Sequence, residues 1–373
     1  MFEKYIVDNA SLTENAEQVE INRIVKNKIG SSKPSQDIEI FTAVVYGKDT
    51  TKYGKKVDTV MENIKKLATA ANEGNIQARA EINAIRTITI QQPLQARLGI
   101  NNVMGNVTTV GLNEELRYEV YQLQGEKSRD QASSGSFVFP TVKKRTGVMD
   151  TKTATGGIIA DYRELASGAT DGFAVANEQV ITDITNKMVL AHITALRNGV
   201  KNATTLKNYA EGITKTNVDA TRKKARRFNP NVTIMGDFSA VDKLGELAQF
   251  AIAAAATEWR FSEAVMEEIM KTGLLKNYRG SAVIELPNSY DLTQLNTAGD
   301  FYKPYLPTGD LWFVPQGIMS PLQIGIRQGI TSMTATDIQI RAEVTRYDVE
   351  YGNYVIPEYV PMIGFVYDSA LDE

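Results

Sequence analysis

The sequence has no cysteine among its 373 residues and only one histidine, His192. The absence of cysteine excludes disulfides, thiolate nucleophiles and cysteine-ligated zinc sites. Histidine catalysis needs a positioned partner, and no G-x-S-x-G motif is present, so we interpret His192 as a packed or solvated residue of a helix. With one histidine and no cysteine, a transition-metal site is not expected.

Other motifs of small-molecule chemistry are also missing. No G-x-G-x-x-G occurs, and the Gly-Lys-Lys run at 54–56 lacks the Ser or Thr and the upstream glycine of a phosphate-binding loop. Carboxylates remain as acid–base candidates, namely Asp161 with Glu164 and Glu267 with Glu268. Adjacent residues on a helix point in different directions, and nothing near the first pair indicates the burial that tunes such groups. We therefore predict no catalytic residue, no metal and no cofactor.

The chain has neither a long hydrophobic run nor an excess of one charge. Its longest apolar stretch covers residues 250–256, whereas a bilayer span needs roughly 20 residues. The first residues show no basic segment followed by an apolar one, so a secretory signal is not expected. Lysine and arginine number 41 against 44 acidic residues, which argues against a dedicated nucleic-acid binder. These features predict a soluble folded protein that has no membrane partner.

A long polar excursion at 116–164 is the most informative feature that is present. Its middle, residues 124–157, contains no Leu and no Ile, so it cannot bury a core of its own. The flanking segments 117–121 and 157–162 have the pattern of strands. Because a long segment without a core is usually disordered or engaged with something else, we interpret it as a β-arm that reaches a neighbouring subunit.

An amphipathic helix is predicted directly after the arm, over residues 173–198. Val180, Ile184 and Met188 form one apolar row at helical spacing. Gly199 stands where a left-handed C-terminal cap is expected. A second helix is predicted over residues 216–227.

The N-terminal region is predicted to be an arm followed by helices. Residues 1–50 contain one short helix between 13 and 30 and a strand-like run over 38–46. An apolar stripe at 57–71 predicts a longer helix, and Pro93 is expected to end the segment before it.

An α/β domain is predicted over residues 232–326. Its strands are punctuated by Pro and Gly, and two helices lie between them, one opening after Gly236 and one capped by Ser262. The predicted strands cover residues 232–235, 282–286, 311–314 and 322–326.

The last strands change their apolar phase. Apolar residues lie on even positions from Ile338 to Val344 and on odd positions from Tyr347 to Tyr351. Because side chains alternate with period two, we expect a bulge or turn near Thr345, giving either a long bent strand or a tight hairpin.

Two groups of charged residues are candidate contact surfaces. The basic run in the helix at 216–227 could face nucleic acid, but a solvated face that makes intersubunit ion pairs is the favoured interpretation. Charges in the arm are suited to fixing its register on a partner. The arm candidates are Glu126, Arg129, Asp130, Lys143, Lys144, Arg145 and Lys152, and the basic face consists of Arg222, Lys223, Lys224, Arg226 and Arg227.

This order of parts resembles the HK97-fold major capsid proteins of tailed bacteriophages. The resemblance rests on the architecture, on the segment 228–236 that enters the α/β domain, and on the closing segment 351–357. It implies an α+β fold with an N-arm, an extended E-loop hairpin, a long spine helix, an α/β axial domain and long terminal strands. The implied boundaries are 1–50 for the N-arm, 51–115 for a helical segment that packs on the peripheral domain, and 116–165 for the E-loop. The spine helix and peripheral domain cover 166–228, the axial domain covers 229–330, and the long strands that return to the peripheral domain cover 331–373.

The resemblance also implies partners and a location. The chain would form hexamers and pentamers of an icosahedral shell, assembled in the cytoplasm of the bacterial host, and would enclose double-stranded DNA through non-specific proximity. A separately encoded scaffolding protein and a portal are expected. Some members cross-link a Lys of the E-loop, and no spacing marks Lys127, Lys143, Lys144 or Lys152 as that residue. Three alternatives stay open: an encapsulin-type nanocompartment shell, a tail or surface-array protein, and an α/β enzyme with an unrecognised site.

Overall fold

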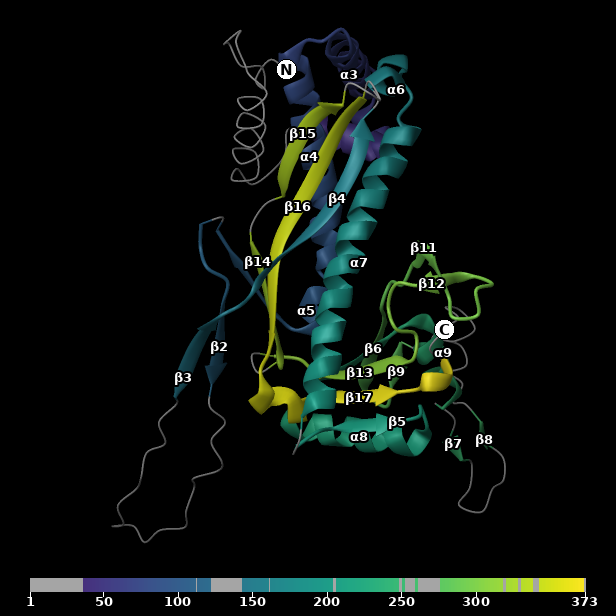
Figure 1. Ribbon diagram of the computed structural model, residues 1–373. Helices are drawn as coiled ribbons and strands as arrows, with labels where there is room; N and C mark the ends of the chain where they lie inside the picture. Colours follow the sequence, from purple (N-terminus) through teal and green to yellow (C-terminus); the bar gives the residue numbers. More distant parts are fainter. Residues whose placement is uncertain are drawn as a thin grey trace.

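The computed structural model describes residues 36–111, 113–121, 143–160, 162–203, 206–247, 250–251, 259–260, 276–317, 320–327, 330–337 and 342–371. One long helix, α7, runs past two sheets, and a layer of helices lies at its N-terminal end (Figure 1). The short elements outside these layers include η2 (Thr51–Tyr53), β7 (Phe250–Ala251), β8 (Trp259–Arg260) and η4 (Ser369–Leu371).

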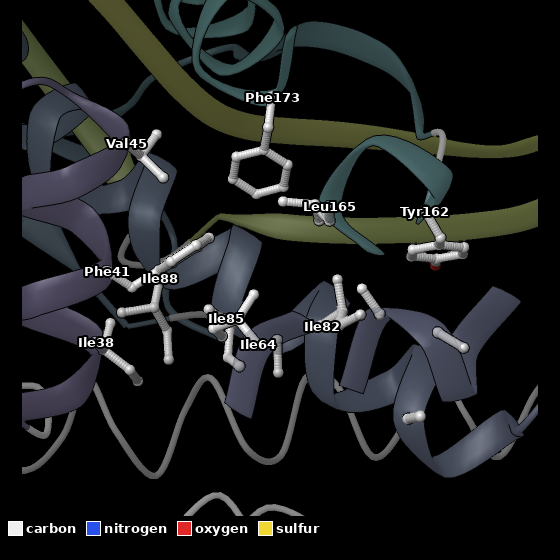
Figure 2. Close-up of a cluster of buried hydrophobic side chains, with 14 of the residues drawn as sticks. Ile38, Phe41, Val45, Ile64, Ile82, Ile85, Ile88, Tyr162, Leu165 and Phe173 are labelled. Carbon is white, nitrogen blue, oxygen red and sulfur yellow. The ribbon is translucent and has the colours of Figure 1, made fainter. Parts of the chain in front are cut away.

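The N-terminal helices share one hydrophobic cluster with the start of α7, where Phe173 lies (Figure 2). Phe41 and Phe173 contact each other with ring centroids 5.7 Å apart. This cluster therefore fixes the helical layer to the end of α7. Its helices are α2 (Gln36–Val45), α3 (Lys56–Asn72), α4 (Ile76–Leu98) and α6 (Tyr162–Ser167), and α5 (Asn101–Met104) follows α4.

The strand predicted over residues 38–46 is wrong, because this segment forms α2. Ile38, Phe41 and Val45 recur at helical spacing and are at most 5% exposed. The β-branched residues of the run fit a buried helical face as well as a strand. This part of the predicted arm is core.

The expected stop at Pro93 is also wrong, since α4 continues through it to Leu98. A proline inside a helix costs about 3 kcal/mol, so packing must offset the missing hydrogen bond. Residues 80–91 of α4 are all buried, which provides such packing. Gly74 lies between the end of α3 and the start of α4, and the Asn75 side chain caps α4 by accepting from the backbone N–H groups of Gln77 and Ala78.

The predicted central helix is confirmed as α7, which covers Asp171–Asn202. It does not end at Gly199. A Cβ at that position would lie 2.7 Å from Val355 Cγ1, so the glycine permits a close approach of strand to helix rather than a cap.

The peripheral sheet is built around the long strand β16. Its strand order is β1-β14-β16-β15, and β4 pairs with the other side of β16. Residues of the first half of α7 pack on this sheet, among them Val180 and Ile184 against Tyr347 and Tyr351. The strands are β1 (Asn106–Val110), β4 (Thr151–Ala160), β14 (Leu322–Arg327), β15 (Thr331–Asp337) and β16 (Ala342–Val355).

The bulge or turn expected near Thr345 is wrong, because β16 continues through this residue and pairs antiparallel with β15. Pairing of β15 with β16 is continuous from Asp337↔Ala342 to Thr331↔Asp348. Thr345 and Tyr347 are both 0% exposed and share the buried face of β16. Val344, on an even position of the same strand, therefore points to the other face of β16 and is half-buried, and Ile338 and Ile340 lie outside the described residues.

The axial sheet has the order β5-β17-β13-β6-β10-β9. Met235, Trp312 and Phe365 pack on the second half of α7. The opposite face contacts α8 and α9 through residues such as Ile234 and Phe313. The elements are β5 (Tyr209–Glu211), α8 (Lys215–Phe228), β6 (Val232–Gly236), α9 (Phe238–Glu246), β9 (Asn277–Tyr278), β10 (Ser281–Glu285), β13 (Asp310–Pro315) and β17 (Gly364–Tyr367).

One predicted strand belongs to a different sheet from the one expected, and the C-terminal strand of the axial sheet was not predicted. The strand at 322–326, placed in the α/β domain by the sequence, is β14 and pairs with β16 and β1. The C-terminal β17 pairs with β13 in the axial sheet, and η3 (Pro357–Met362) carries the chain there. The helix expected from Ser262 lies outside the described residues.

Candidate intersubunit surfaces

The stem of the predicted β-arm is an antiparallel hairpin that projects from the body (Figure 1). It consists of β2 (Arg117–Tyr121) and β3 (Lys144–Val148), with Arg117 opposite Val148 and Tyr121 opposite Lys144. The segment at 151–160, which the sequence placed inside the arm, is strand β4 of the peripheral sheet. The projecting part therefore begins near residue 116, as predicted, but ends near Val148 instead of residue 164.

Aromatic side chains fix the stem to the body. The rings of Tyr118 and Tyr354 stack with centroids 3.9 Å apart and an angle of 9° between them. The Tyr359 hydroxyl accepts from Tyr121 N at 2.9 Å and donates to Tyr121 O at 2.5 Å. Val120, 4% exposed, packs in a cluster with Tyr359. The direction of the hairpin is thus set by contacts with the segment that follows β16.

Two glycines make room for the root of the hairpin. Met149 N donates to Leu116 O at 2.8 Å, which closes the stem. A Cβ on Gly352 would lie 3.0 Å from Met149 Cβ, and one on Gly325 would lie 3.0 Å from Leu116 Cδ2. Paired glycines of β14 and β16 therefore let Leu116 and Met149 lie flat on the peripheral sheet.

Two of the charged residues that were predicted to hold the arm on a partner form ion pairs within the subunit. Lys144 pairs across the hairpin with Glu119 at 2.5 Å, and Arg145 pairs with Glu358 at 3.1 Å. The hydrogen bond to Glu119 raises the pKa of Lys144. Lys143 is exposed, whereas Lys152 lies in β4. Lys127, Glu126, Arg129 and Asp130 lie outside the described residues.

Arg222 does not belong to the exposed basic face that the sequence predicted for this helix. Arg222 is 7% exposed, and its Nη1 donates to Arg279 O at 2.9 Å. Desolvation lowers its pKa. Arg279 in turn pairs with Asp219 at 2.5 Å. The face of α8 that is open to solvent therefore consists of the other four cations, Lys223, Lys224, Arg226 and Arg227.

His192 is a packed residue, as the sequence indicated. It is 0% exposed on α7, where Asn353 Nδ2 lies 3.2 Å from its Nδ1 and the Tyr351 ring meets it edge-on at 5.5 Å. The Asn353 amide also donates to Ala191 O. Because an amide NH₂ group can only donate, Nδ1 accepts and the ring is neutral. Burial, and then the charge of Lys152, lower the pKa of His192 to about 4.

We expect His192 to make the folded subunit sensitive to acid. The stabilising contribution of the neutral ring is complete above pH 6.5 and is lost as the pH falls toward 4. The loss reaches about 3 kcal/mol, at 1.36 kcal/mol per pKa unit. Urea unfolding of the unassembled subunit at pH 7.5 and 4.5 measures it, with His192→Leu as the comparison. Equal losses for both proteins would contradict the prediction.

The other candidate residues do not form a metal or catalytic site in the described part of the chain. Among the described residues, no three His, Asp or Glu side chains are placed to hold a metal ion. Asp161, Glu267 and Glu268 lie outside the described part, as does the side chain of Glu164. No described helix combines the length and the apolar character that crossing a bilayer requires.

The sequence analysis missed two features, the contacts that anchor the β2–β3 stem and a second hairpin. The alternation of Tyr118, Val120 and the neighbouring polar residues signals a strand, but its partners at 354–359 are far away in the sequence. A second hairpin, β11 (Tyr290–Leu295) with β12 (Tyr302–Pro304), also escaped prediction. The signal for it was the Asn296-to-Gly299 turn between two aromatic segments.

A family model described as "SPbeta prophage-derived putative capsid protein YonB" matches residues 20–367. No curated protein matches the chain significantly in sequence. Among solved structures, the chain is similar to one from Microbacterium phage Oxtober96, with 12% identity, a TM-score of 0.46 and coverage of 71% of this chain and 91% of that chain. For the capsid of Cyanophage P-SCSP1u the values are 10%, 0.45, 71% and 86%. For a virus-like particle from Pyrococcus furiosus they are 11%, 0.41, 73% and 97%.

Proposed function

Since the chain belongs to the YonB capsid protein family, we propose that it is the structural subunit that self-assembles into the icosahedral shell of a tailed bacteriophage. The observation that carries this proposal is the family match over residues 20–367, which includes both sheets, α7 and the hairpin stem. The role is structural rather than enzymatic. The protein is a component of the virion capsid.

The architecture suits a subunit of a closed shell. The α+β arrangement of hairpin, spine helix, axial domain and long terminal strands is the one predicted from the resemblance to HK97-fold capsid proteins. Contacts repeated by symmetry close into rings when the rotation permits, so many modest interfaces suffice. The β2–β3 stem is held by its own subunit through Tyr118 and Tyr359 and projects from the body (Figure 1).

The proposal includes the composition of the shell, its place of assembly, its contents and its partner proteins. The shell consists of hexamers and pentamers, forms in the cytoplasm of the bacterial host, and encloses double-stranded DNA. A separately encoded scaffolding protein and a portal take part. Lys223, Lys224, Arg226 and Arg227 contact either an acidic surface of a neighbouring subunit or the enclosed DNA, and intersubunit ion pairs remain the favoured role.

Isolation of particles from cells that carry the complete phage genome tests the proposal. We expect this chain to be the most abundant protein of the particles, and their DNA to resist nuclease until the shell is disrupted. Particles that hold an enzyme and no protected DNA would instead support a nanocompartment. Tubes or flat sheets in place of particles would support a tail or surface-array protein.

A further inference from the structure

The hairpin β11–β12 exposes a concentrated group of apolar side chains. It is inserted between β10 and β13 of the axial sheet and lies beside α7 (Figure 1). Phe301 touches both Tyr290 and Tyr302, with ring centroids 5.1 and 6.0 Å apart. We name these side chains the hairpin patch: Tyr290 (48% exposed), Leu292 (72%), Leu295 (59%), Phe301 (55%) and Tyr302 (41%).

The base of this hairpin is held firmly to the body. Asn288 Nδ2 donates to Asp237 Oδ1 at 2.7 Å and to Leu306 O at 3.0 Å, while Leu306 N donates to Asn288 Oδ1 at 2.8 Å. Asn186 of α7 donates to the Ser289 hydroxyl at 2.7 Å. The hairpin therefore leaves the axial domain in a defined direction.

The tip is ordered by one asparagine. Asn296 accepts at its Oδ1 from Gly299 N at 2.8 Å and donates from its Nδ2 to Asp300 at 2.9 Å. Its backbone N donates to Phe301 O at 2.9 Å. A surface that is ordered before binding loses less conformational entropy when a partner covers it, which favours a docking role.

Within the part of the chain that the structure describes, the side chains of the patch stay exposed. A cleft of about 620 Å³, lined by Lys187, Arg197, Asp291 and Lys303 among others, lies between the hairpin and α7. The hairpin has only two strands, and such a ribbon is marginally stable in water unless another layer packs on it. A second molecule that packs on the patch would supply such a layer.

The chemistry of the hairpin selects the class of partner. Its charged residues are Asp291, Asp300 and Lys303, a net negative set that disfavours both DNA and a membrane surface, which attract lysine and arginine. Side chains of roughly 200 Å² at these exposures present about 500 Å² of surface. That is at the upper end for a monomer and over half of the roughly 800 Å² that one partner buries in a stable interface.

We propose that the hairpin patch docks on a second copy of this chain and forms an apolar contact between subunits of the shell. The proposal rests on the proposed function, because a self-assembling shell places copies of this chain around every subunit. The contact is heterologous, so the patch meets a different surface of the neighbour. It is separate from the contact expected at the far end of the β2–β3 hairpin.

The absence of cysteine permits a direct test by thiol labelling. Leu292→Cys introduces the only thiol, and we expect maleimide to react with it rapidly in the free subunit and at least about tenfold more slowly in the shell, because interface cores exclude water. Lys66→Cys, at a position whose side chain is 71% exposed on α3, serves as the matched control. Equal labelling of Leu292→Cys in both states would overturn the proposal. Protection only in complete particles, and not in shells of this chain alone, would also overturn it.

A charge placed in the patch tests its energetic role. We expect Leu292→Asp to raise the concentration needed for assembly at least about tenfold, which corresponds to about 1.4 kcal/mol, because the substitution both removes a central apolar contact and buries a charge. Gln294→Asp adds the same charge at an exposed polar position of the same hairpin and should assemble normally. Normal assembly of Leu292→Asp would contradict the proposal. If the unsubstituted chain formed no shell, the proposed function itself would fail.

Discussion

Gly147→Ala is expected to leave the subunit folded and to raise the concentration needed for shell assembly by at least about tenfold, a loss of more than about 1.4 kcal/mol of assembly free energy. A Cβ at this position would lie 2.3 Å from Cζ of Tyr118. The ring can escape only by leaving its stack on Tyr354. Pairing of β2 with β3 does not need the stack, so the hairpin persists but loses its fixed direction.

Light scattering against protein concentration measures this effect, and thermal unfolding of the free subunit checks that the fold is retained. Gly245→Ala is the matched control, because a Cβ there meets nothing within 4 Å. Tyr118→Ala should reproduce the defect of Gly147→Ala without introducing a clash. Assembly of both hairpin variants at the concentration of the unsubstituted chain would show that the stem direction does not matter.

Glu81→Gln is expected to abolish most of the stability loss that Glu81 causes in the unsubstituted subunit as the pH rises from 5 to 9. Glu81 is 0% exposed on α4, and its two carboxylate oxygens have no hydrogen-bond partner within the described structure. Burial raises its pKa from 4.5 to about 8. The folded state therefore favours the protonated acid, and its stability falls as the pH rises toward and through 8.

Glu81 is expected to contribute a loss of about 3 to 4 kcal/mol between pH 5 and pH 9, from the pKa difference at 1.36 kcal/mol per unit, and the difference between the unsubstituted subunit and Glu81→Gln isolates this contribution. Urea unfolding of the free subunit at these two pH values measures it. Glu62→Gln, at an exposed position of α3 where Glu62 pairs with Lys66, should retain the full loss. The same loss in Glu81→Gln would mean that another group accounts for the alkaline sensitivity.

Elements defined by local periodicity were predictable from the sequence. The row of Val180, Ile184 and Met188 predicted α7, and strands β6, β10 and β13 were recognised because each is a short apolar run between turns. The segment 38–46 was misassigned because a short, β-branched apolar run fits both a strand and a buried helical face. Local pattern thus gives the type of an element best where the element is long.

The pairing of strands and the contacts between elements could not be predicted, because they depend on residues far apart in the chain. The apolar run at 322–326 identifies a strand but contains nothing that selects β16 rather than β13 as its neighbour. In the same way, the burial of Arg222 depends on a carbonyl oxygen at position 279. The β2–β3 hairpin is anchored by a hydrogen bond between Tyr359 and Tyr121. The lack of a core in the polar excursion predicted that this segment projects, but not which residues anchor it.

The most direct test of the shell-forming role is electron microscopy of the purified chain, with light scattering alongside. We expect closed shells of uniform size, or hexamers and pentamers that close when a scaffolding protein is supplied. A compact dimer or tetramer that never assembles at any salt or protein concentration would contradict the account.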